Sequence, residues 1–78
     1  MATTEARIRL RDRTWMEMAR RVKGLSQKEV AEAAGCSEVY YNRIEKGLQM
    51  PNVDIGLRIA DFLGVDAHSF LNEKTLSQ

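Results

Sequence analysis

The stretch GLSQKEVAEAAGCSEVYYNRIEKG, residues 24–47, decides the fold because it holds two short helical patterns with almost nothing between them. Each pattern opens on a serine that can cap a helix and closes on a glycine that can end one: Ser26 to Gly35, and Ser37 to Gly47. Two helices joined by about three residues must cross steeply. This spacing predicts a helix-turn-helix unit over residues 26–46.

The residues at the predicted crossing meet the requirements of that geometry. Ala31 is small enough to lie where the helices touch, and Gly35 tolerates the positive φ of the turn. Glu29 completes a capping box with Ser26. The apolar residues expected beneath the crossing are Val30, Ala34, Cys36, Tyr41 and Ile44. Because these independent conditions are met at fixed offsets, the pattern is specific.

Another helix is expected just before this unit. Thr14 and Glu17 have the spacing of a second capping box, and Lys23 and Gly24 stop the pattern. Its apolar residues recur at helical spacing: Trp15, Met18, Ala19 and Val22. The sequence therefore predicts a helix from Thr14 to Val22.

The first thirteen residues differ from the rest in charge and in pattern. Residues 1–23 carry seven Lys or Arg against three acidic residues, a balance of +4, whereas the whole chain carries only +1. Residues 6–13, ARIRLRDR, alternate arginine with apolar residues, and a period of two is typical of a strand. We expect an extended or β-strand arm over residues 1–13; a single long helix from Thr4 to Val22 is the alternative.

The C-terminal third of the chain predicts two more helices. Asn52 can cap a fourth helix that Gly64 ends, and its apolar residues are Val53, Leu57, Ile59, Ala60 and Leu63. Asp66 can cap a fifth helix, which carries Phe70 and Leu71. Residues 74–78 are polar and expected to fray. The sequence therefore predicts an all-α, five-helix domain over residues 14–73.

Composition excludes several classes of protein. No apolar run reaches the roughly 18 residues of a membrane span, and no secretory leader is recognisable. The single Cys36 excludes an internal disulfide and fits a reducing cytoplasm. His68 has no second ligand at metal-binding spacing, and no nucleophile–base pair, phosphate loop or carboxylate dyad occurs. We therefore expect neither an enzyme nor a metal, cofactor or small-molecule ligand.

The chain resembles the phage-repressor and Cro-like helix-turn-helix regulators, also called the xenobiotic-response-element family. The run GLSQKEVAEAAGCSEVYYNRIEKGLQMPNVDIGLRIADFLGV follows that family's pattern GLSQxxLA, GVSxxxISxIExG, P and IAxxLxV, and the resemblance extends over residues 16 to about 71. It implies a five-helix domain that binds operator DNA, usually as a two-fold dimer. It also implies a partly buried ion pair between Arg20 and Glu45.

The resemblance and the side-chain chemistry together suggest which residues touch DNA. They are Gln27, Lys28, Ser37, Glu38, Val39, Tyr40, Asn42, Arg43, Lys46 and Gln49. The planar fork of Arg43 matches guanine O6 and N7, whereas Glu38 accepts from cytosine N4 and repels phosphate. Val39 or the Tyr40 ring can rest on a thymine methyl group. Lys46 and Gln49 fall where the family clamps the DNA backbone.

Two departures from the family pattern leave alternatives open. Tyr41 stands where the family has Ile or Val, so it is expected in the core with its hydroxyl paired, or else facing DNA. Gly56 replaces a residue that is usually Leu, and marks either a close approach of helices or subunits or a weak point in the helix.

The function expected from these features is sequence-specific regulation of transcription. Residues 24–51 carry three basic and four acidic side chains, a balance of −1, so positive charge must come from elsewhere. Arg7, Arg9 and Arg11 of the arm are the candidates. We expect a repressor that binds a palindromic operator as a homodimer through Phe70 and Leu71. An antitoxin with the same fold and a protein-interaction module without DNA binding are the alternatives.

Overall fold

The computed structural model describes residues 12–70. The arm with its arginines Arg7, Arg9 and Arg11 lies outside the described residues, as do Leu71 and the tail that was expected to fray. The described chain forms, in order, α2 (Thr14–Val22), α3 (Gln27–Ala34), α4 (Glu38–Glu45), α5 (Val53–Leu63) and the 3₁₀ helix η1 (Ala67–Phe70). It contains no strand, so the predicted all-α class holds for this part of the chain.

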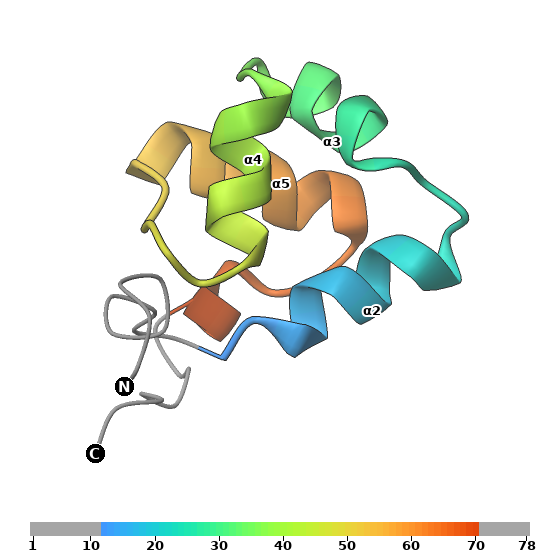
Figure 1. Cartoon of the computed structure of the whole chain (residues 1–78). Helices are drawn as coiled ribbons and strands as arrows, with labels where there is room; N and C mark the ends of the chain where they lie inside the picture. Colours follow the sequence, from blue (N-terminus) through green and yellow to red (C-terminus); the bar gives the residue numbers. More distant parts are fainter. Residues whose placement is uncertain (1–11, 71–78) are drawn as a thin grey trace, which may run out of the picture.

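The helices enclose one core (Figure 1). α2 and α3 each pack against both α4 and α5, and η1 packs against α5. The largest fully buried apolar side chains come from all four α helices: Met16, Val30, Tyr41, Ile44, Ile59 and Leu63. Tyr41 is therefore a core residue, as predicted.

The caps predicted for α3, α4 and α5 are confirmed. The Ser26 hydroxyl accepts from Glu29 N at 3.0 Å, and Glu29 Oε1 accepts from Ser26 N at 2.7 Å, which completes the capping box. Ser37 and Asn52 cap the next two α helices in the same way. Gly35, with φ of 79°, ends α3 in the left-handed conformation and makes the sharp turn into α4.

The predicted N-cap of α2 is wrong. Arg13, not Thr14, is the N-cap residue, because both N and Oγ1 of Thr14 donate to Asp12 Oδ1. Of the four predicted apolar residues, Trp15 and Ala19 are partly buried against the core, whereas Met18 and Val22 are 59% and 85% exposed. Met16 is fully buried in their place. Two arginines are largely buried on the same side, Arg13 at the N-cap and Arg20 within α2, so the inward side is partly polar and a search for apolar spacing does not find all of it.

The predicted fifth helix is not confirmed as an α helix: among the described residues, the chain after Asp66 forms the 3₁₀ helix η1. Ser69 N donates to the Asp66 carbonyl at 2.9 Å, the i to i+3 bond that defines this tighter helix. The Asp66 carboxylate accepts from His68 N, two positions along the chain. The capping side chains of α3, α4 and α5 instead accept from the backbone N three positions along. Phe70 nevertheless reaches the core and is 6% exposed.

Gly56 lies in the middle of α5 without a backbone contact that requires glycine. A Cβ atom there would lie 3.4 Å from Pro51 Cγ and 3.9 Å from Phe70 Cε2, which is ordinary van der Waals contact. We therefore expect Gly56→Ala to raise the free energy of unfolding by about 1 kcal/mol through helix propensity. Urea unfolding measures it, and a loss of stability would show that the site needs more room than this geometry indicates.

Candidate nucleic-acid interface

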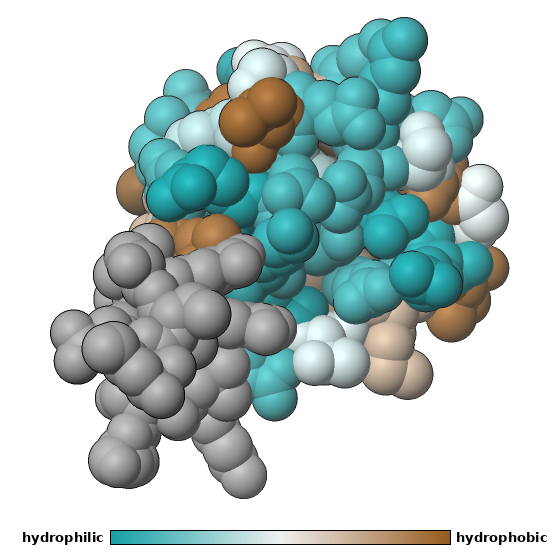
Figure 2. All heavy atoms as spheres, viewed as in Figure 1, coloured by the Kyte–Doolittle hydropathy of each residue, from teal (hydrophilic) through white to brown (hydrophobic). Residues whose placement is uncertain are grey.

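α4 presents one exposed edge that the described part of the protein leaves uncovered. We call the exposed side chains Glu38, Val39 and Arg43 the outer edge of α4. Val39 is 72% exposed although it is apolar. In Figure 2, which shows the molecule from the side where α4 lies in front, the surface is mostly hydrophilic with isolated hydrophobic side chains. A helix edge of mixed polar and apolar groups has the composition needed to read bases.

Other predicted contact residues lie on α3, on α4 and in the loop that follows α4. Ser37 caps α4, with its hydroxyl accepting from Tyr40 N at 3.0 Å, and the Tyr40 side chain packs partly against the core. Lys28 and Lys46 are exposed. Gln49, in the loop over residues 46–52 that we call the α4–α5 loop, accepts from Arg43 Nε through Oε1 at 3.3 Å.

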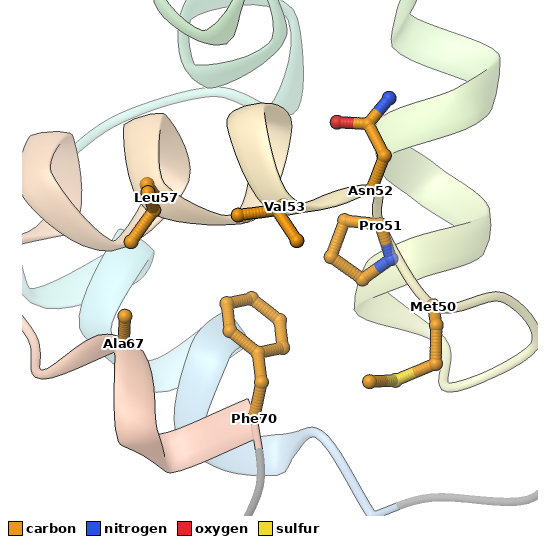
Figure 3. Close-up of a pocket in the computed structure, with 8 residues that line it drawn as sticks. Met50, Pro51, Asn52, Val53, Leu57, Ala67 and Phe70 are labelled. Atoms are coloured by element: carbon orange, nitrogen blue, oxygen red, sulfur yellow. The ribbon is translucent and has the colours of Figure 1, made fainter.

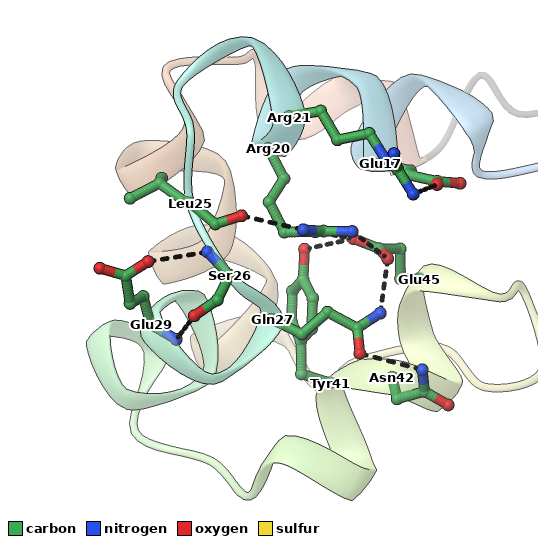
Figure 4. Close-up of polar contacts among 10 residues, drawn as sticks. All are labelled: Glu17, Arg20, Arg21, Leu25, Ser26, Gln27, Glu29, Tyr41, Asn42 and Glu45. Atoms are coloured by element: carbon green, nitrogen blue, oxygen red, sulfur yellow. Dashed lines mark hydrogen bonds and ion pairs between the residues drawn. The ribbon is translucent and has the colours of Figure 1, made fainter.

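The inner side of α4 is fixed by an ion pair with α2 (Figure 4). Arg20 Nε lies 2.7 Å from Glu45 Oε2, and Arg20 Nη2 donates to Glu45 Oε1 at 3.2 Å. Arg20 Nη1 also donates to the Leu25 carbonyl at 2.9 Å, which ties the pair to the loop before α3. Both side chains are largely buried, so this two-pronged contact is shielded from water.

Two further groups complete the shell around Glu45. The Tyr41 hydroxyl donates to Glu45 Oε2 at 2.9 Å, which supplies the partner that a buried hydroxyl needs. Gln27 Nε2 donates to Glu45 Oε1 at 2.7 Å, and Gln27 Oε1 accepts from Asn42 Nδ2 at 3.1 Å. Gln27 and Asn42 therefore use their amides to join α3 to α4, in addition to any role at DNA.

These contacts shift the pKa values of the group. Burial raises the pKa of the Glu45 carboxyl, but hydrogen bonds from Arg20, Gln27 and Tyr41 outweigh it and hold that pKa below its ordinary 4.5. Burial, followed by the adjacent Glu45 charge, raises the pKa of the Tyr41 phenol strongly. The network is therefore an ionised carboxylate braced by an arginine and a neutral phenol.

Arg13, which the sequence analysis assigned to the basic arm, is fully buried in the folded domain. Its Nη1 donates to the carbonyl of Ile44 at 2.6 Å and to that of Gln49 at 2.9 Å. Its guanidinium also lies over the Phe70 ring, 5.2 Å from the centroid. The burial of Arg13 cannot be predicted from neighbouring residues, because the carbonyl groups that accept its hydrogen bonds lie 31 and 36 positions along the chain.

The two arginines of α2 are also engaged within the protein. Arg20 pairs with Glu45, and Arg21 Nη2 lies 2.8 Å from Glu17 Oε2 on the surface. Much of the positive charge counted in residues 1–23 therefore serves the fold. The arginines that precede Asp12 lie outside the described residues.

An apolar groove of about 200 Å³ opens beside α5 (Figure 3). It is lined by Met50, Pro51, Asn52, Val53, Gly56, Leu57, Ala67 and Phe70. Val53 and Leu57, two of the apolar residues expected on this helix, are 78% and 52% exposed and border the groove. Phe70, predicted at a dimer interface, contributes its ring to the floor of the groove.

Other kinds of site are not found in the part of the chain that the structure describes. Residues 12–70 contain no group of three His, Cys, Asp or Glu side chains that could hold a metal ion. His68 Nδ1 lies 2.9 Å from Asp66 Oδ1 at the surface. None of the described helices is long and apolar enough to cross a membrane.

Comparison with known proteins agrees with this geometry. The helix-turn-helix family model matches residues 16–70. The HTH-type transcriptional regulator YqaF of Bacillus subtilis is 38% identical over 61 residues, which cover 78% of this chain and 80% of YqaF. The chain also matches half the length of the HTH-type transcriptional regulator SinR of Bacillus licheniformis, with 39% identity over 56 residues, 70% of this chain.

Solved structures show the same fold. The N-terminal DNA-binding domain of SinR from Bacillus subtilis has a TM-score of 0.68 and 33% identity, over 80% of this chain and 91% of that one. SinR, described as the master regulator for biofilm formation, in complex with DNA has a TM-score of 0.67 and 31% identity, over 77% and 97% of the two chains. The chain therefore belongs to the Cro/C1-type helix-turn-helix family of DNA-binding transcriptional regulators, which are not enzymes.

Proposed function

We propose that this chain is a sequence-specific double-stranded DNA-binding repressor that acts as a homodimer on a palindromic operator. The observation that carries the proposal is the outer edge of α4, where Arg43 and its neighbours stand exposed while the opposite side is anchored in the core. A side chain whose helix is held rigidly from behind can meet base edges at a fixed position. The DNA complex of the related SinR supports this assignment.

Affinity that does not depend on sequence comes from positive charge around that edge. Lys46 and Lys28 are exposed, and the arm arginines Arg7, Arg9 and Arg11 add the charge that the helix-turn-helix unit lacks. Glu38 opposes phosphate, so it acts by discriminating between bases. This division separates residues that read sequence from residues that hold the DNA backbone.

The homodimer forms, in this proposal, through the apolar groove and its rim. Met50, Val53 and Leu57 are 43%, 78% and 52% exposed and lie together beside Pro51, on a chain of only 78 residues. Exposed apolar side chains at the rim of an apolar groove can pack against the same surface of a second copy about a two-fold axis. Burial of these exposed side chains stabilises the pair.

The experiment that tests the proposed function is selection of random duplex DNA by the purified full-length protein. We expect enrichment of an inverted repeat whose half-sites are about one helical turn, 10–10.5 base pairs, apart. Enrichment of single, unpaired sites would contradict the dimer, and recovery of no preferred sequence would contradict the function itself.

Substitutions then separate the two kinds of contact on the selected operator. We expect Arg43→Ala to cost about 1–3 kcal/mol of binding free energy at one base position, whereas Lys46→Ala weakens binding to all sequences alike. Removal of residues 1–11 should reduce the slope of log K against log salt, because fewer counterions are released. Titrations at several salt concentrations measure both effects. Equal losses on every sequence from Arg43→Ala would exclude it as a reader.

A further inference from the structure

The α4–α5 loop is attached to the end of α4 by one buried side chain from the start of the domain. Arg13 Nη1 donates both to the Ile44 carbonyl, in the last turn of α4, and to the Gln49 carbonyl in the loop. One nitrogen therefore fixes the distance between the helix and the loop. Both contacts join residues more than 30 positions apart, so they are a property of the folded domain.

The rest of the Arg13 guanidinium is held just as closely. Nη2 lies 2.7 Å from Met50 Sδ, and the group stacks over Phe70; both of these partners are drawn in Figure 3. A buried guanidinium is stable only where its donors are satisfied, and the planar fork suits several acceptors at once. The backbone of Gln49 is consequently set by a rigid, buried support.

Gln49 in turn contacts the outer edge of α4. Its Oε1 accepts from Arg43 Nε at 3.3 Å, while its backbone carbonyl accepts from Arg13. Because Nε is engaged, Arg43 is left to address DNA with its two terminal nitrogens. These form a planar fork of the kind that contacts guanine O6 and N7.

We propose that Arg13 and Gln49 are positioning residues for base reading. Arg13 fixes the backbone of Gln49, and Gln49 fixes the direction of the Arg43 fork, so discrimination at one base pair depends on a side chain buried away from DNA. This inference rests on the proposed function, since it concerns how Arg43 reads. The inference goes beyond the proposed function because it assigns a part in base specificity to Arg13 and Gln49, which need not touch a base.

The test compares affinity for the selected operator with affinity for an operator changed at the base pair that Arg43 reads. Gln49→Met keeps the length of the side chain and removes its acceptor. We expect the ratio of the two affinities to fall about fivefold to tenfold. In an Arg43→Ala background the same substitution should cause no further fall, because the residue it positions is gone.

Arg13→Lys keeps a positive charge but replaces the planar fork by a single ammonium group, and should lower the same ratio. Ile59→Val, a core change in α5 away from the loop, is the matched control: it lowers thermal stability without changing the ratio. In the free protein, both Gln49→Met and Arg13→Lys should shift the NMR signal of the Arg43 Nε–H group, whereas Ile59→Val should not.

The outcomes are distinguishable. An unchanged ratio in Gln49→Met, or equal weakening on both operators, would overturn the inference while leaving the proposed function intact. An unchanged ratio in folded Arg13→Lys would remove Arg13 from the pathway. If the wild-type protein itself binds both operators equally, the proposed function fails and the inference fails with it.

Discussion

Replacing Arg20 with alanine should lower the free energy of unfolding by about 3–5 kcal/mol, because it leaves a buried carboxylate without its cation. Glu45 is 7% exposed, and after the change it would retain only neutral donors from Gln27 and Tyr41 among the described contacts. Small domains have a total stability of about 5–15 kcal/mol, so much of it would be lost. Urea unfolding followed by circular dichroism measures the effect.

Arg21→Ala is the matched control for this experiment. It removes the same type of side chain one position along α2, but the Arg21–Glu17 pair is exposed at the surface. Exposed pairs contribute about 0–1 kcal/mol, so we expect little change. Similar losses of unfolding free energy in Arg20→Ala and Arg21→Ala would show that the buried ion pair stabilises the fold no more than the exposed one.

The same network predicts how stability depends on pH. Because the pKa of Glu45 is lowered in the folded state, its contribution is present above the ordinary value of 4.5 and is lost as pH falls through the lower folded-state value. In Arg20→Ala the main hydrogen bonds that lower this pKa are absent, so that part of the acid dependence should be smaller. Unfolding curves at pH 7 and below 4.5 provide the comparison.

Leu57→Asp should convert the proposed dimer to a monomer and weaken operator binding by about 100-fold or more, since the two half-sites are then no longer bound together. Leu57 is half exposed at the groove, so the substitution places a charge at the proposed interface without opening the core. Light scattering after gel filtration reports the oligomeric state, and titration reports the affinity.

Val22→Asp provides the control, because Val22 is an 85% exposed apolar residue on α2 that does not line the groove. It should remain dimeric and keep its affinity. A Leu57→Asp protein that stays dimeric would show that the two copies meet elsewhere, while the DNA-binding proposal would survive.

The features that could be predicted from the sequence are those that neighbouring residues determine. Ser26, Ser37 and Asn52 cap helices through bonds to backbone groups three residues away, so their positions are visible in any short window. Gly35 and Gly64 end helices because few other residues accept a positive φ. The helix-turn-helix unit follows directly from these local rules.

The features that escaped prediction depend on distant partners. Arg13 is buried only because carbonyl groups of α4 and the following loop are placed to receive it. Val53 and Leu57 have helical spacing, but they lie on the exposed side of α5, while the opposite side of this helix packs in the core. Gln27 and Asn42 were both assigned to DNA and also bond to each other, since an amide is equally suited to protein and DNA.

The anchoring of α4 from one side alone has a consequence for how such a regulator diversifies. The groups that hold the helix, Tyr41, Ile44 and Glu45, share no position with Glu38 and Val39, which project outward. Exchange of those outward residues changes stability by only about 0.5 kcal/mol. New target sites can therefore arise by a few codon changes in gene duplicates, with the scaffold inherited unaltered.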